Sequence, residues 1–283
     1  MTMRVSFKTR PQHTEWAPMR DFWREADRIG LYDAGWTFDH AYPIFSDPTG
    51  PCFEGWTMLA YLAALTRRIR LGVLVTDNTL RHPGLLANMA ATVDVASGGR
   101  LEIGLGAGWS EEEHHAYGIP LPPIGERFDR LAESCEVIHR LLTQERTTFD
   151  GHHYKLTGAL CEPKPHQRPR PPLVIGGKGE RRTLQIAARW ADQWNYPGGD
   201  PAELRHKIEV LHAHCADLGR DPAEIEVSVK LEADIDPAAF ADLAAAYREA
   251  GAQHVIAHFP APHRPEQLVA LAEHLEPLVR SEI

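Results

Sequence analysis

The 283-residue sequence has few cysteines, no excess of basic residues and no long apolar run. Its four cysteines are widely spaced without a Cys-x-x-Cys pair, which indicates reduced thiols rather than a zinc site or a disulfide framework. With 30 Lys and Arg against 39 Asp and Glu, the net charge of −9 argues against a partner such as nucleic acid or an anionic membrane. No stretch approaches the roughly 20 apolar residues of a membrane span, and residues 1–10 lack the apolar segment of a signal peptide. We therefore expect a cytoplasmic protein.

Short apolar runs and helical periodicities alternate along the chain. The hydrophobic fraction of 43% is enough for a sizeable core, and no linker-like segment or repeat divides the sequence. Eight strand and helix pairs in this length predict an α/β fold, a single (β/α)8 TIM barrel formed by residues 1–283 as one domain. The expected strands are residues 3–7, 34–38, 70–76, 101–105, 173–175, 192–195, 225–231 and 254–259.

An additional segment separates the fourth and fifth expected strands. Asp150-Gly151 stands between β-prone flanks in residues 147–156, which predicts a hairpin. Residues 161–172, which follow, are dense in Pro, Arg and Lys. We expect the two segments to form an insertion after strand four that lies over one mouth of the barrel.

The stretch from Arg100 to Ser110, RLEIGLGAGWS, is an apolar strand pattern that ends in glycines. A Gly-x-Gly turn after a strand suggests a dinucleotide-binding fold, but Trp109 stands where a third glycine would be. Three glutamates at positions 111–113 follow, and they would repel a pyrophosphate. The glycines therefore indicate that a group other than a dinucleotide pyrophosphate comes close to this backbone.

Polar or glycine-rich sequence follows five of the expected strands. Because a barrel of this type carries its active site at the carboxyl ends of the strands, we expect these segments to meet in one site. They are Asp39-His40, Thr76-Asp77-Asn78, Gly106 to Trp109, Gly176 to Gly179, and Asn195.

The segment Gly176-Gly177-Lys178-Gly179 precedes an expected helix. Glycines free several backbone N–H groups to converge on an anion, and a helix N-terminus adds positive potential. Lys178, Arg181 and Arg182 strengthen this interpretation. A glycine turn needed only for packing is the alternative.

Asp39-His40 could be an acid–base pair or an ordinary strand-end cap. Its position at the end of an expected strand favours the catalytic interpretation, since imidazole titrates near neutral pH.

Tryptophans and paired histidines raise two further possibilities. Trp109, with Trp36 and Trp56, could form walls for a planar ring or belong to the core. The histidine pairs at 114–115 and 152–153 are adjacent rather than at metal-binding helical spacing, so we expect no metal site.

Several segments, in order and over nearly the whole chain, resemble the luciferase-like monooxygenase superfamily. Within it they are most similar to the branch that uses the deazaflavin coenzyme F420, although members that use FMN share much of the pattern. The segments are SFKT, FDH at Phe38–His40, LGVLVT at Leu71–Thr76, the run from Arg81 to Pro123, GERFDRL at Gly125–Leu131, and IGGKGERRTL followed by ADQWN.

The resemblance implies a luciferase-like TIM barrel in which a flavin-like ring lies across the strand ends and its phosphate meets the loop after strand five. It also implies a bulge with a cis peptide near the end of strand three. The implied coenzyme-binding residues are Asp39, Val75, Thr76, Gly106, Ala107, Gly108, Trp109, Gly176, Gly177, Lys178 and Gly179.

The resemblance further implies that His40 is the catalytic proton donor or acceptor. Hydride transfer to or from a hydroxyl-bearing carbon needs a matched proton transfer, which an imidazole supplies well. Glu113 and His115 are candidates for the substrate side, or else residues of a solvated helix start.

Three functions remain open at this point. The leading hypothesis is an F420-dependent oxidoreductase acting on a small alcohol, carbonyl compound or activated alkene; the second is an FMN-dependent monooxygenase that uses reduced flavin and O2. The third is a catalytically silent barrel that binds a flavin or a phosphorylated ligand. Relatives often form homodimers through helices on the barrel face, and the sequence leaves this open for the present chain.

Overall fold

The computed structural model describes residues 2–279, and within them eight parallel strands close into a barrel. The strands are β1 (Arg4–Thr9), β2 (Ala34–Thr37), β3 (Arg70–Asp77), β4 (Leu101–Gly106), β7 (Leu173–Gly176), β8 (Gln193–Tyr196), β9 (Glu226–Glu232) and β10 (His254–Phe259). Around the barrel they follow the order β1-β10-β9-β8-β7-β4-β3-β2, so the first strand of the chain pairs with the last. The predicted α/β TIM barrel is confirmed.

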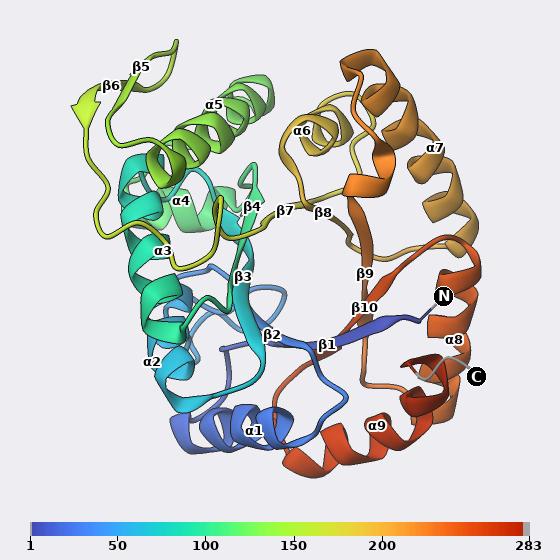
Figure 1. Cartoon of the computed structure of the whole chain (residues 1–283). Coiled ribbons are helices and arrows are strands. Elements are labelled where there is room, and N and C mark those ends of the chain that lie inside the picture. Colours follow the sequence, from blue (N-terminus) through green and yellow to red (C-terminus); the bar gives the residue numbers. More distant parts are fainter. Residues whose placement is uncertain (1, 280–283) are drawn as a thin grey trace.

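Helices form an outer ring around this barrel (Figure 1). Within residues 2–279, no helix has both the length and the apolar character needed to cross a membrane. The helices are α1 (Trp16–Arg28), α2 (Gly55–Leu65), α3 (Pro83–Ser97), α4 (Glu111–Tyr117), α5 (Ile124–Thr143), α6 (Thr183–Trp190), α7 (Pro201–Leu218), α8 (Pro237–Glu249) and α9 (Pro265–Val279), with one 3-10 turn at Pro222–Glu224.

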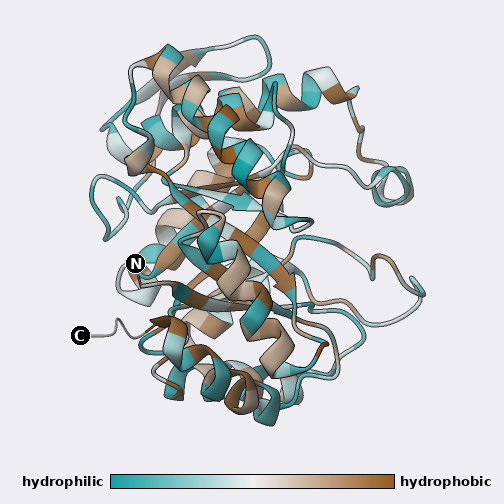
Figure 2. Cartoon of the chain, turned by 90° about the vertical axis from the view of Figure 1, so that its right-hand side faces the viewer, coloured by the Kyte–Doolittle hydropathy of each residue, from teal (hydrophilic) through white to brown (hydrophobic). Residues whose placement is uncertain are grey.

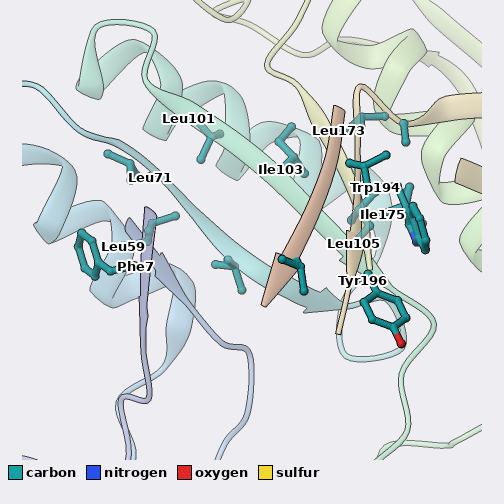
Figure 3. Packing of buried hydrophobic residues seen from close by; sticks show 14 of the residues in the cluster. Phe7, Leu59, Leu71, Leu101, Ile103, Leu105, Leu173, Ile175, Trp194 and Tyr196 are labelled. Atoms are coloured by element: carbon teal, nitrogen blue, oxygen red, sulfur yellow. The ribbon is translucent and has the colours of Figure 1, made fainter. Parts of the chain in front are cut away.

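The barrel wall separates two hydrophobic layers, because successive strand residues face opposite sides. Residues that face outward, such as Leu71, Ile103 and Ile175, join the large core between strands and helices (Figure 3). Figure 2 shows hydrophobic residues along the central strands and mixed colouring on the helices around them. A smaller cluster of Ala34, Trp36, Leu74, Val174 and Ile256 forms a separate layer.

A charged network lies at the amino ends of the strands. The Arg4 guanidinium binds Asp33, Glu226 and Glu102, with the last two contacts at 2.5 and 3.2 Å. Arg70 Nε lies 2.5 Å from a carboxylate oxygen of Glu102. Each buried or half-buried carboxylate therefore has a cationic partner, as burial requires, and this end of the barrel is occupied by paired charges.

The expected insertion is present, and its Pro-rich part lies at the amino ends of the strands. Strands β5 (Thr147–Asp150) and β6 (Lys155–Ala159) form the predicted antiparallel hairpin. Its tip is held on α5 because the Glu133 carboxylate accepts the backbone N–H groups of residues 152–154 at 2.8 to 3.0 Å. In the Pro-rich segment, Gln167 Nε2 donates to the Leu101 carbonyl at 2.7 Å, at the amino end of β4. The mouth that this segment meets is therefore the amino-terminal one.

Strand β3 carries the irregularity that the resemblance implied. The Leu74–Val75 peptide is cis, and the register of β3 with β4 shifts between Val73 and Thr76. As a result the Val75 side chain lies at the carboxyl end of the barrel, beside the strand ends of β4 and β7.

Glycines on the neighbouring strands make room for this bulge. A Cβ atom on Gly104 would lie 2.1 Å from the Val73 carbonyl oxygen. A Cβ on Gly106 or Gly176 would lie 2.4 or 2.6 Å from a Val75 methyl group. The glycines that end β4 and β7 are thus needed to accommodate Val75 of β3, whether or not a ligand also approaches them.

We expect Gly104→Ala to lower the free energy of unfolding by about 1–3 kcal/mol, the usual cost of overpacking, because its Cβ would meet a backbone carbonyl that cannot rotate away. Urea denaturation measures this. Gly30→Ala is the matched control, because nothing lies within 4 Å of the Cβ position there, and we expect a change below about 0.5 kcal/mol. Equal midpoints for the two variants would contradict the packing argument.

Candidate active site

A cavity of about 350 Å³ opens at the carboxyl ends of the strands, where the sequence predicted the site. The cavity lies among segments far apart in the sequence, from β1 through β10, so only the closed barrel assembles it. The predicted site residues that line it are Asp39, His40, Val75, Asp77, Gly106, Ala107, Gly108, Trp109, Gly176, Gly177 and Asn195.

His40 and Glu113 form a hydrogen-bonded pair at this cavity. His40 follows β2, and its Nδ1 lies 2.8 Å from Glu113 Oε2 on α4. The other carboxylate oxygen of Glu113 accepts the backbone N–H of Ala41. Glu113 is buried, with 1% of its side chain exposed, so it lies behind the imidazole and does not line the cavity. The carboxylate orients the ring and leaves Nε2 as the nitrogen available to a ligand.

The electrostatics of this pair keep the carboxylate ionised. Burial acts to raise the pKa of Glu113, but the hydrogen bonds from His40 and from the Ala41 N–H outweigh it and hold the pKa below its ordinary value. An ionised carboxylate accepts hydrogen bonds only, so Nδ1 carries a proton directed at Glu113. The imidazole can therefore take up or release a proton at Nε2 while Nδ1 stays bonded.

Asp39, next to His40, has a different role from an acid–base group. Arg81 binds both of its carboxylate oxygens, one at 3.0 Å, and the Asp77 N–H donates to it at 2.9 Å. Burial raises the pKa of the Asp39 carboxyl and the Arg81 guanidinium opposes this effect. Asp39 therefore ties the end of β2 to the segment that follows β3, and so fixes the backbone from which His40 projects.

Trp109 lies at the rim of the cavity. Its ring packs edge-on to His40, with centroids 5.5 Å apart, and stacks on Phe45 at 5.2 Å with an interplanar angle of 4°. Phe45 and Trp109 are 82% and 48% exposed, so an apolar surface borders the entrance. The other two candidate wall residues, Trp36 and Trp56, are fully buried core residues.

The glycine loop after β7 presents free backbone donors. The Gly177 N–H donates to the Asn195 carbonyl, and the Gly177 carbonyl accepts the Trp194 indole N–H. Within the described part of the chain, the N–H groups of residues 178–180 have no protein acceptor. These donors precede α6 and fit an anion, as the sequence indicated.

Three predicted coenzyme residues lie outside the cavity lining. Thr76 is buried, and its hydroxyl accepts the Trp56 indole N–H at 3.1 Å. The Lys178 ammonium lies 3.1 Å from Glu203, so its charge is already paired. Gly179 belongs to the loop but does not reach the cavity. At Gly179 only the backbone donor described above is available to a ligand.

The substrate-side and metal candidates fall elsewhere. Glu113 lies behind His40, and His115 is exposed on α4 outside the cavity. His114 is buried with Nε2 2.6 Å from the Thr79 hydroxyl. Among residues 2–279, no group of three His, Cys, Asp or Glu side chains is arranged to hold a metal ion.

The cavity also has a basic side that was not predicted from the sequence. Lys8, Arg10, Lys230 and His258, from the carboxyl ends of β1, β9 and β10, all belong to the lining. One signal was available in the sequence, because Lys8 and Lys230 are charged residues near the ends of apolar strand patterns. Their meeting depends on the pairing of the first strand with the last, which no local pattern reveals.

A closed parallel barrel with a cavity at the carboxyl ends of its strands is the arrangement of TIM-barrel enzymes. The chain belongs to the luciferase-like monooxygenase family, whose model matches residues 2–281.

Two relatives show the extent of the sequence similarity. The chain is 31% identical over 242 residues to a protein of Kineococcus radiotolerans named F420-dependent glucose-6-phosphate dehydrogenase, covering 83% of this chain and 70% of the relative. It is 32% identical over 198 residues to an uncharacterised protein of Mycobacterium tuberculosis, covering 67% of this chain and 68% of that protein.

Solved structures share the fold over the full length. An F420-dependent secondary alcohol dehydrogenase, solved with an F420–acetone adduct, superimposes with a TM-score of 0.85 at 18% identity, covering 99% of this chain and 100% of the other. A monooxygenase from Streptomyces bottropensis gives 0.80 at 19% identity, covering 97% and 99%. At these identities the similarity establishes the fold.

We expect Arg81→Met to lower the free energy of unfolding by about 3 kcal/mol at pH 7, because it leaves the Asp39 carboxylate buried without its cation. Asp39 is 3% exposed. Since burial raises the pKa of Asp39, the variant recovers stability as the carboxyl takes up a proton, and the loss should shrink from pH 7 to about pH 5.

Urea unfolding at both pH values measures this difference. The control is Arg28→Met, which removes an exposed guanidinium paired with Glu25, and we expect less than about 0.5 kcal/mol from it. A loss that stays constant or grows at the lower pH would contradict the assigned role of Asp39.

Proposed function

We propose that the chain is a coenzyme F420-dependent oxidoreductase that transfers a hydride between the deazaflavin and a small organic substrate, an alcohol, a carbonyl compound or an activated alkene. The observation that carries the proposal is the His40–Glu113 pair at the cavity, with Nδ1 and the carboxylate 2.8 Å apart. Relatives and solved structures named for F420-dependent enzymes support the choice of coenzyme.

The residues present fit a planar ring with a phosphate-bearing side chain. Val75 and the backbone of Gly106 to Gly108 offer a wall with few side chains. The free N–H groups of residues 178–180 suit the phosphate. When bound, the deazaflavin supplies the carbon that accepts or gives the hydride.

His40 supplies the matching proton chemistry. Oxidation of an alcohol releases a hydroxyl proton, which Nε2 accepts as the hydride leaves; reduction of a carbonyl runs the same step in reverse. Glu113 keeps Nδ1 protonated in both directions and stabilises the positive charge that forms on the ring. Trp109 packs edge-on to the imidazole and limits its rotation.

Titration of the purified protein with coenzyme F420 and, separately, with FMN tests the choice of coenzyme. Trp109 is half exposed at the cavity, so quenching of tryptophan fluorescence should report binding. We expect F420 to bind at least about tenfold more tightly than FMN, a difference of about 1.4 kcal/mol. Tighter FMN binding with oxygen consumption would replace the proposal by a monooxygenase function, and binding without turnover on a substrate panel would favour a sensor or carrier.

We expect Glu113→Gln to lower turnover by about 10²-fold or more, the contribution typical of general acid–base catalysis, because the amide cannot stabilise a positive imidazole. Coenzyme affinity should change little, since Glu113 lies behind His40. Glu111→Gln on the same helix is the matched control, because Glu111 is exposed and outside the cavity lining.

His40→Gln should reproduce the loss of turnover. A variant that carries both His40→Gln and Glu113→Gln should lose no more turnover than either single variant, because the two residues act as one unit. Steady-state kinetics of all three variants decide this. Independent, multiplying losses would show that Glu113 and His40 do not cooperate.

A further inference from the structure

The basic side of the cavity is a built arrangement on three neighbouring strands. In the register of the sheet, Lys8 on β1 pairs with His258 on β10, and His258 pairs with Glu232 on β9. Lys230 lies two residues before Glu232, and Arg10 lies two residues after Lys8. Because every second residue of a strand points to the same face, the side chains of these four residues and of His258 share one face. We call Lys8, Arg10 and Lys230 the basic wall.

One carboxylate, that of Glu232, binds every other member of this group except Lys8. Glu232 accepts hydrogen bonds from Lys230 at 2.8 Å, from Arg10 at 3.3 Å and from His258 Nδ1 at 3.0 Å. Arg10 Nε also donates to His258 Nε2 at 3.0 Å, so both imidazole nitrogens are engaged as in the neutral ring. Burial lowers the pKa of His258 to about 3, in agreement with this neutral form.

Among residues 2–279, no carboxylate lies within hydrogen-bond distance of the Lys8 ammonium. The ammonium donates to the Leu74 carbonyl at 2.6 Å. Burial, together with repulsion from Lys230 and Arg10, lowers its pKa to about 7. At neutral pH the basic wall therefore contains the cations Arg10 and Lys230 and a partly protonated Lys8, against the single counter-charge of Glu232.

Acidic groups elsewhere in the cavity lining do not balance the positive charge of the basic wall. Asp39 is neutralised by Arg81 on the other side of the cavity. Asp77 accepts hydrogen bonds from the backbone N–H and the hydroxyl of Thr79. The charges that most affect the pKa of Lys8 are Lys230, Glu232 and Arg10. A cavity side with uncompensated positive charge is suited to an oxyanion.

We propose that the basic wall binds an oxyanion of the substrate, a carboxylate or a phosphate ester, and so directs the reacting carbon toward His40. This inference rests on the proposed function, and it narrows the substrates to those that carry an anionic group. The coenzyme's own phosphate has separate donors in the loop after β7, which leaves the basic wall to the substrate.

Sulfate is the probe, because its charge stays constant through neutral pH. Calorimetric titration of the purified protein should show saturable sulfate binding, without coenzyme and again with coenzyme F420 bound. Lys230→Met should weaken sulfate binding by about tenfold or more through loss of one charge-assisted contact. Lys155→Met is the control, because Lys155 is an exposed cation on the hairpin with 73% of its side chain accessible. This variant should bind sulfate with the affinity of the wild type.

A second variant is expected to strengthen sulfate binding rather than weaken it. Glu232→Gln removes the counter-charge and should tighten sulfate binding, a gain that a misfolded cavity cannot produce. Absence of saturable binding in the wild type, or equal affinities in the Lys230 and Lys155 variants, would overturn the proposal. Displacement of sulfate by coenzyme F420, with weaker coenzyme binding in Lys230→Met, would assign the wall to the coenzyme instead. If the protein binds no F420, the proposed function fails, while the sulfate titration still decides whether the wall binds an oxyanion.

Discussion

The site depends on how Val75 sits between two glycines. The bulge in β3 places the Val75 methyl groups where Cβ atoms of Gly106 and Gly176 would otherwise be, at 2.4 and 2.6 Å. Because glycine alone can occupy those positions, β4 and β7 end in open backbone on either side of one apolar residue. The bulge thus shapes the central wall of the cavity. The loops after β4 and β7 begin at the two glycines that pack against it.

The two sides of the cavity differ in electrostatic character. On the side formed after β2 and β3 the carboxylate of Asp39 is paired with Arg81, and that of Glu113, behind the lining, is paired with His40; each orients or anchors a neighbour. The side formed by β1, β9 and β10 carries the basic wall. Since polar contacts fix orientation in mostly apolar pockets, such a division favours one orientation of a bound molecule.

Much of the fold and part of the site could be predicted from the sequence. Apolar runs located all eight barrel strands to within a few residues, because each strand is buried on both faces. Strand ends also located His40 and the glycine loops. The partnership of Glu113 with His40 could not be predicted, since a carboxylate in an acidic helix start has the same local pattern whether it is solvated or buried. The glycines of β4 stand out in the sequence, but their closest neighbours lie on β3, Val73 for Gly104 and Val75 for Gly106, and only the register shift reveals that.

The paired charges at the amino end have a kinetic consequence. Arg4 and its carboxylate partners, with the apolar layer of Trp36 and Ile256, leave the cavity open at one end only. If coenzyme and substrate share this cavity, as the proposed function requires, both enter by the carboxyl end of the barrel. A coenzyme ring that rests against Val75 beneath the substrate would then have to bind first and leave last, which is an ordered kinetic mechanism.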